Sequence, residues 1–183
     1  MTRLAIGLVV SACAFGADTV LTFDPPTTSI QWTLGTVLHT VHGTFQLKSG
    51  TIHFDSSTGQ ASGSLVVSAA TGESGNEARD RRMQRAILES TRFAEVVFTP
   101  DRVIGQVALE GKSTIQVHGN FELHGTGHEF TMPVDVEIKN GQAVASSHFT
   151  VPYIKWGLKN PGSFVLHVDD TVDIEIQATA RLN

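Results

Sequence analysis

The chain has 183 residues, 40% of them hydrophobic and 17% charged, which is the composition of a globular domain and excludes a disordered or low-complexity chain. This length suits one domain, which buries roughly 70% of the surface that its unfolded chain exposes. The formal net charge of −5, with no Lys/Arg run interleaved with aromatic residues, argues against a nucleic-acid partner.

The first 17 residues predict an export signal. Residues 1–3 supply a positive start, residues 4–15 form a short apolar run, and small residues at 14–17 offer a cleavage site. The apolar run is too short to span a bilayer as a helix, so we predict no stable membrane span. We therefore predict a signal peptide over residues 1–17 and a mature domain over residues 18–183, located in the periplasm or secreted.

Cys13 is the only cysteine, so cleavage after residue 17 leaves a mature chain that cannot form an internal disulfide. An alternative stays open at this position. Residues 10–13 also resemble a bacterial lipobox, in which Cys13 is lipidated and becomes the first mature residue. The sequence thus predicts export by either route and leaves the signal-peptidase class undecided.

From Val20 onward, apolar and polar residues alternate with a period of two, the pattern of strands with one wet face. Residues 55–59 have the composition of a turn. The first half of the chain predicts strands over residues 30–34, 41–47, 51–54, 63–70 and 95–99, the last ending at Pro100, and a short strand or pair of strands within 103–110.

One helix is predicted, over about residues 75–90, because this stretch alone repeats at helical spacing. Ser74 and Glu77 have the spacing of a capping box. One face carries Met83, Ala86 and Ile87, and the opposite face carries Arg81, Arg82, Arg85 and Glu89. Arg79 projects to the apolar side. The helix is therefore either a lid over an opening or a plug that completes the core, with Arg79 held in an ion pair.

The second half of the chain shows the cleanest alternation. Strands are expected over residues 115–123, 134–138, 147–153, 164–168 and 172–180, and Asn140-Gly141 is a strong hairpin signal. Eight to ten strands joined by short turns suit an antiparallel sandwich or a closed barrel, and closure has the advantage that it removes exposed edges. The inward positions mix small residues such as Gly43 and Ala178 with large ones, which fits either a ligand tunnel or a packed taper.

No catalytic residue, metal site or cofactor is predicted, and the chain is read as a non-enzyme. His39 and His42 point to opposite faces of a strand, and no His-Glu-x-x-His helix exists. The sequence also lacks a Gly-x-Ser-x-Gly elbow. Asp169-Asp170 falls in a predicted turn, where solvated charge is the default.

Several motifs resemble the YceI-like family of exported bacterial proteins. His39-Thr-Val-His-Gly-Thr-Phe45 precedes Gly50-Thr-Ile-His-Phe-Asp55, and Asn76-x-x-Arg79-Asp80-x-x-Met83 follows. Later come Val117-His-Gly-Asn-Phe-Glu-Leu123, Met132-Pro-Val134 and Tyr153-Ile-Lys-Trp-Gly157. The order and spacing of these motifs match the family over about residues 20–182. Met83 replaces the usual leucine, and Phe93-Ala94 stands where many members have Tyr-Pro.

The resemblance implies an all-β, eight-stranded, antiparallel lipocalin-like barrel with one amphipathic helix at one end. It further implies a long apolar tunnel that holds a polyisoprenoid or similar lipid chain. The expected ligand-binding residues are Trp32, Leu34, Phe45, Arg79, Met83, Phe98, Phe121, Phe149, Tyr153 and Trp156. For each aromatic and aliphatic residue of this set, packing in an ordinary core is an equal alternative.

Two other functions stay open. One is a protein-interaction or stress-related β-barrel module with a filled core. The other is a weak isoprenoid-acting enzyme, which would need a polar pair inside the lumen. The oligomeric state is also open, a homodimer included.

Overall fold

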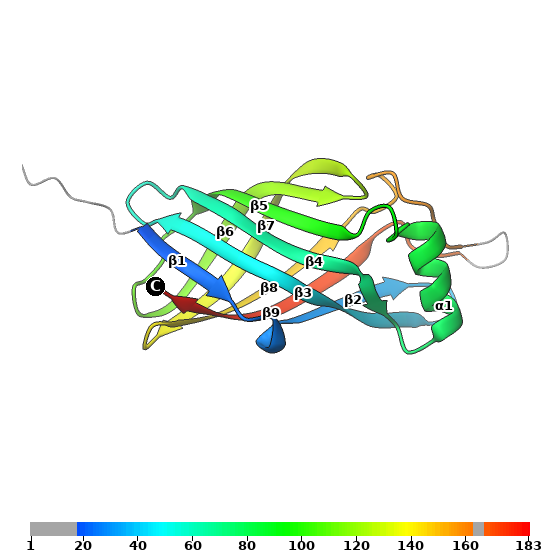
Figure 1. Cartoon of the computed structure of the whole chain (residues 1–183), viewed down its shortest axis with the longest axis horizontal. Helices are drawn as coiled ribbons and strands as arrows, with labels where there is room; N and C mark the ends of the chain where they lie inside the picture. The colour runs from blue at the N-terminus through cyan, green and yellow to red at the C-terminus, as the bar shows by residue number, and fades with distance from the viewer. Residues whose placement is uncertain (1–17, 163–166) are drawn as a thin grey trace, which may run out of the picture.

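The computed structural model describes residues 18–162 and 167–183, and these form one closed antiparallel barrel with a short helix at one end (Figure 1). The predicted signal peptide and Cys13 lie outside the described residues. The strands are β1 (Asp18–Phe23), β2 (Ser29–Gly35), β3 (Thr40–Asp55), β4 (Ala61–Glu73), β5 (Glu95–Ile104), β6 (Gly111–Leu123), β7 (Thr126–Lys139), β8 (Gln142–Val151) and β9 (Val172–Leu182).

Nine strands make an eight-stranded barrel because β1 and β2 share one position. Both pair with β3 and with β9: β1 at one end of the barrel and β2 at the other. A single 3-10 turn, η1 (Pro25–Thr27), separates the two. Every other strand pairs with its neighbours in chain order, and β9 closes the ring. The predicted barrel is therefore confirmed over the sandwich, and closure leaves no long free edge.

The turns sort the barrel into two ends. The β3–β4, β5–β6 and β7–β8 hairpins lie at the same end as the C-terminus, and the helix lies at the other (Figure 1). Asn140 and Gly141 both adopt positive φ, 52° and 73°, in the two-residue β7–β8 turn, which confirms the predicted hairpin. We call these the hairpin end and the helix end.

The β5–β6 region differs from the prediction. Strand β5 does not end at Pro100 but runs to Ile104, with an irregularity in its pairing to β6 between Pro100 and Arg102. A bulge is one of the few places where a strand tolerates a proline that cannot donate a hydrogen bond. Residues 105–110 form a loop and not a strand. The strand predicted over 164–168 falls partly outside the described residues; within it, Val168 makes one isolated bridge to Thr36.

The helix is shorter than predicted and begins differently. It comprises α1 (Glu77–Arg82) and a π-helical turn, η2 (Met83–Ile87). The capping box of Ser74 and Glu77 was wrong: Asn76 is the N-cap, and its side chain accepts a hydrogen bond from the amide of Arg79 at 3.0 Å. Among the described residues, no helix has the length and apolar character needed to cross a membrane.

Two groups of buried side chains lie inside the barrel. At the hairpin end, Ile115, Val136, Ile138 and Ala143 form a cluster that we call the packed cluster. Toward the helix end, a larger group includes Phe98, Met132, Phe149, Tyr153 and Leu158. The second group surrounds a space instead of filling it, as described next.

Candidate functional site: an apolar cavity under the helix

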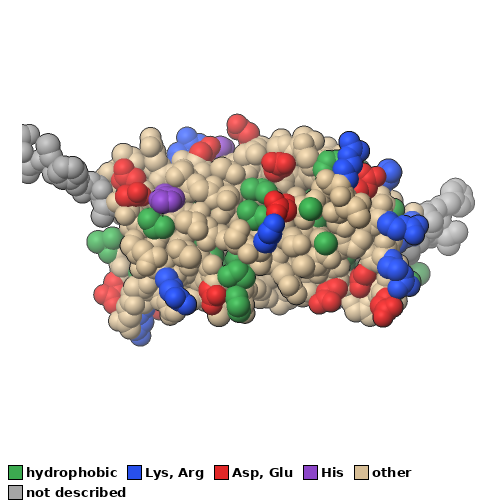
Figure 2. All heavy atoms as spheres, viewed as in Figure 1, with side chains coloured by type: hydrophobic (Ala, Val, Ile, Leu, Met, Phe, Trp, Pro, Cys, Tyr) green, Lys and Arg blue, Asp and Glu red, His purple; other side chains and the backbone are tan. Residues whose placement is uncertain are grey.

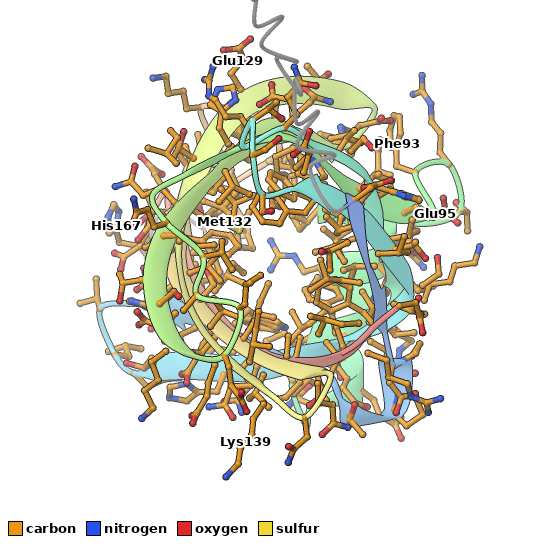
Figure 3. All side chains as sticks on the ribbon, turned by 90° about the vertical axis from the view of Figure 1, so that its left-hand side faces the viewer. Phe93, Glu95, Glu129, Met132, Lys139 and His167 are labelled. Carbon is orange, nitrogen blue, oxygen red and sulfur yellow. The ribbon has the colours of Figure 1, made fainter. Side chains whose placement is uncertain are left out.

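A cavity of about 470 Å³ occupies the helix-end part of the barrel. Figure 3 looks into the barrel from the hairpin end and shows side chains from all around the ring pointing toward an open centre, Met132 among them. Most of the lining is aliphatic or aromatic. It includes Ile30, Val41, Leu47, Leu65, Val67, Val96, Leu123, Met132, Val151, Leu158, Val172, Ile174, Ile176 and Ala178.

Strands β2 and β3 form one wall of the cavity. Their alternation turns Trp32, Leu34 and Phe45 inward, and all three line the space. Trp32 is only 5% exposed and lies against Gly43, where a Cβ atom would approach the indole ring to 2.3 Å. A glycine is required there because any side chain would collide with the indole. The small residue of this wall therefore makes room for the large one.

Strands β5, β6 and β8 supply the opposite aromatic wall. Phe98, Phe121 and Phe149 all line the cavity. Phe121 contacts the other two, with ring centroids 6.4 Å from Phe98 and 6.3 Å from Phe149. Tilted and edge-on rings at these separations attract one another, so this wall is rigid.

The helix closes one end of the cavity. Met83, Ile87 and Leu88 line it, as does the predicted inward cation Arg79. Arg82 was expected on the outer face, yet it also lines the cavity while remaining exposed to solvent. Its position follows from the spacing to Arg79, because side chains three residues apart in α1 are neighbours on the helix surface.

Arg79 is bonded to the loop before the helix. Its Nε donates to the Ser74 hydroxyl at 2.7 Å, and its Nη2 donates to the Ser74 carbonyl at 2.9 Å. The Ser74 hydroxyl in turn donates to Asp80. No described carboxylate lies within ion-pair distance of Arg79, so the ion pair considered for it is not formed. A cation without a counter-ion therefore sits half-buried in the cavity wall.

Tyr153 is the most deeply buried polar residue of the cavity lining. It is 6% exposed, and its hydroxyl donates to the Asp169 carbonyl at 2.7 Å. Burial, followed by the negative charges of Asp170 and Asp169, raises the pKa of Tyr153 to about 12. The phenol is thus neutral at any physiological pH, and its hydrogen bond joins the beginning and the end of the β8–β9 loop.

Trp156 is the one expected residue that does not line the cavity. Its ring stacks on His128 at 4.2 Å and 3° and meets Phe130 edge-on at 5.7 Å. The strand register explains this position, since His128 and Phe130 lie on β7 closer to the helix end than Met132. Trp156 therefore packs against the barrel end beside the cavity, and the other nine expected residues line it.

Thr36 and His39 flank the β2–β3 turn at the mouth; His39 is exposed, like Arg82, and Thr36 is partly buried. Thr28, also partly buried, lines the cavity just before β2. No Asp, Glu, Ser or Cys belongs to the described lining. Over residues 18–162 and 167–183, no three His, Cys, Asp or Glu side chains come together in a way that would hold a metal ion. The cavity can hold an apolar chain, with cations and hydroxyls near one end.

The missed lining residues, such as Leu65, Val67, Met132 and Ile176, carried a usable signal. Each lies on the apolar phase of an alternating strand, and each is paired with a residue of a neighbouring strand. Leu65, for example, stands opposite Phe98. Strand pairing would have identified them, whereas attention to aromatic residues alone did not.

Comparison with known proteins adds a family and a fold. The model of the YceI-like domain matches residues 21–180. Among curated proteins, no sequence matches significantly. Three solved structures show the same fold at low sequence identity.

BcnA of Burkholderia cenocepacia aligns with a TM-score of 0.70 and 13% identity, covering 86% of this chain and 98% of that one. A polyisoprenoid-binding domain from Saccharophagus degradans, implicated in plant cell wall breakdown, aligns at 0.64 and 12%, covering 89% and 98%. The YceI protein of Campylobacter jejuni aligns at 0.60 and 13%, covering 73% and 80%.

Proposed function

Because the chain belongs to the YceI-like family, we propose that it is an exported binding protein that holds a polyisoprenoid or similar long apolar lipid in its barrel cavity. The observation that carries the proposal is the lining. A cavity of about 470 Å³ walled almost entirely by aliphatic and aromatic side chains offers a polar ligand few hydrogen-bond partners to replace water. The polyisoprenoid-binding domain from Saccharophagus degradans, which shares the fold, supports the choice of ligand class.

The size of the cavity sets a scale for the ligand. At about the 30 Å³ that one water molecule takes in the liquid, a space of about 470 Å³ holds roughly 15 carbon atoms. Burying them contributes on the order of 12 kcal/mol at about 0.8 kcal/mol per carbon. Association and chain ordering cost about 4 to 15 kcal/mol, so micromolar binding is reached when that cost is near its lower limit.

The lining also supports binding over catalysis. An isoprenoid-acting enzyme would need an acid–base or nucleophilic pair inside the lumen. The described lining instead offers Tyr153, whose pKa is raised to about 12, and cations near the mouth. The filled-core interaction module has no support from a barrel that encloses this much space.

Organic extraction of the purified protein, followed by mass spectrometry, tests the proposal. We expect an apolar chain compound in near-stoichiometric amount, and an added polyisoprenol should be taken up by stripped protein. Ile174→Trp fills the cavity and should lower both the extracted amount and the uptake. Val144→Trp, on the outer face of β8 at 54% exposure, should change neither.

Two results would overturn the proposal. One is an extract free of apolar compounds together with no polyisoprenol uptake by the stripped wild type. The other is equal uptake by the Ile174→Trp and wild-type proteins, because the ligand would then lie outside the cavity. Fractionation of the native host would test the proposed export separately from binding.

A further inference from the structure

We propose that the helix end of the barrel docks on an anionic lipid bilayer, with Val37 and Leu38 inserted among the lipids and the arginines of the helix contacting phosphate groups. The inference rests on the proposed lipid-binding function and names the surface through which the ligand would be exchanged. The inference rests on two features at the helix end of the barrel: an exposed apolar β2–β3 turn and a basic helix.

The β2–β3 turn presents two apolar side chains to solvent. Val37 is 70% exposed and Leu38 is 78% exposed, among the most exposed large hydrophobic residues of the described chain. Thr36 and His39, immediately before and after them, line the cavity. The two apolar side chains therefore stand at the rim of the opening.

The turn is held in shape by hydrogen bonds. The amides of Leu38 and His39 donate to the Thr36 hydroxyl oxygen at 3.3 and 3.1 Å. The amide of Thr36 donates to the His39 carbonyl at 3.1 Å, and the amide of Val37 donates to the His167 carbonyl at 3.3 Å. A turn whose amides are paired in this way has fewer polar groups to desolvate when it enters the interfacial region of a bilayer.

The neighbouring helix is basic. Four of the chain's 13 Lys and Arg residues fall within residues 79–85. Arg81, Arg82 and Arg85 are exposed. Figure 2 shows Lys and Arg side chains gathered at the end of the molecule where α1 lies in Figure 1.

The acidic groups nearby do not cancel this charge. Glu77 pairs with Arg81 at 3.1 Å, and Asp80 accepts a hydrogen bond from Ser74. Arg82 and Arg85 have no described carboxylate within ion-pair distance. Each Lys or Arg near an anionic membrane surface raises partitioning onto the membrane roughly fivefold, and this attraction falls off within a Debye length. The whole chain carries −5, whereas residues 77–87 hold four arginines and two carboxylates.

The hairpin end provides a contrast. It also exposes apolar residues, Ile104 at 46% and Leu109 at 81%. However, the packed cluster lies inside the barrel at that end, and none of its residues lines the cavity. A bilayer contact there would lie next to the packed cluster and not next to the cavity lining. Docking by the helix end would instead let an apolar chain pass between bilayer and cavity without crossing water.

Sedimentation with vesicles tests the proposal. The full-length mature protein is mixed with phosphatidylcholine vesicles containing about 30% phosphatidylglycerol, and with pure phosphatidylcholine vesicles. We expect binding to the mixed vesicles that weakens with added salt. The double variant Val37→Ser/Leu38→Ser should lose on the order of tenfold in partitioning. Arg81→Gln/Arg85→Gln, which leaves the cavity lining unchanged, should lose roughly 30-fold.

The matched control is Ile104→Ser/Leu109→Ser at the hairpin end, which should bind the mixed vesicles like the wild type. Docking is overturned if the wild type does not bind these vesicles, or if the control loses as much as the Val37/Leu38 variant. Uptake of polyisoprenol delivered from ethanol is measured in parallel. Uptake without vesicle binding overturns docking alone, and vesicle binding without uptake overturns the proposed ligand and leaves docking standing.

Discussion

Apolar and polar residues alternate along the strands at both ends of this barrel, but the inward side chains pack together at the hairpin end and line a cavity at the helix end. On β7, Val136 and Ile138 belong to the packed cluster, whereas Met132, on the same face of the same strand, lines the cavity. On β8, Ala143 is packed and Phe149 lines the cavity. One strand therefore contributes to a group of side chains packed against one another at one end and to the cavity lining at the other.

The difference lies in what closes each end. At the hairpin end, Ile115, Ile138 and Ala143 come from the consecutive strands β6, β7 and β8 and pack against one another. At the helix end, the helix and the β8–β9 loop lie over the opening and supply Met83, Ile87 and Leu158 from above. Large side chains there stand around the wall and do not meet at the centre. An apolar strand face is removed from water when a helix or loop lies over the end of the barrel, even where no side chain fills the space in front of it.

The largest expected effect compares the same substitution at the two ends. Ile138→Ala removes a fully packed side chain and leaves a cavity, so it should lower the free energy of unfolding by about 3 kcal/mol. Ile176→Ala, at a position that already faces empty space, should cost less than about 2 kcal/mol because no close packing is lost on one side. Urea unfolding measures both. Equal losses would show that the helix end is as tightly packed as the hairpin end.

The second effect comes from adding atoms. Ala143→Leu inserts three carbons into the packed cluster, where Ala143 is 2% exposed, and should cost about 1 to 3 kcal/mol in unfolding free energy. Ala178→Leu adds the same atoms to the cavity wall and should leave stability nearly unchanged while reducing polyisoprenol uptake. Thermal melts and uptake assays on the same samples check the pair. A destabilised Ala178→Leu protein with normal uptake would contradict the comparison.

Much of the fold was accessible to sequence reasoning. Period-two alternation located most strands, and Asn140-Gly141 marked its hairpin because only residues that tolerate positive φ fit that turn. The strand end predicted at Pro100 was wrong because β5 pairs with β6 on both sides of the bulge, so the proline does not end the strand. Helix length and capping were wrong because Ser74 bonds Arg79 and Asp80, which leaves Asn76 to cap.

The site was accessible only in part. Hydrophobicity and alternation place Trp32, Phe45 and Phe98 inward, but they do not state how far each is from the opposite wall. That distance depends on barrel closure and on where the helix settles, both of which arise from contacts between residues far apart in the chain. For the same reason Trp156, which shares the composition of the lining residues, lies on His128 beside the cavity.

The smallest expected difference in stability between two matched variants concerns the helix that closes the helix end. Arg79→Ala removes two hydrogen bonds to Ser74 at a half-buried site, which should cost about 1 to 2 kcal/mol of unfolding free energy. Because Arg79 also lines the cavity, its loss should speed ligand release more than it lowers the melting temperature. Transfer of a fluorescent polyisoprenoid analogue to acceptor vesicles measures release.

Asn76→Ala is the matched control for this substitution. It removes the N-cap of the same helix at a cost of about 1 kcal/mol, and Asn76 itself does not line the cavity. Faster release in Arg79→Ala alone identifies Arg79 as a ligand contact and the helix as a lid. If both variants release ligand equally fast, release depends on how firmly the helix is seated. If the melting temperature of Arg79→Ala lies far below that of Asn76→Ala and ligand release is unchanged, the helix is a plug. A helix that completes the core cannot open without unfolding the barrel, so its weakening appears as a loss of stability and not as faster release.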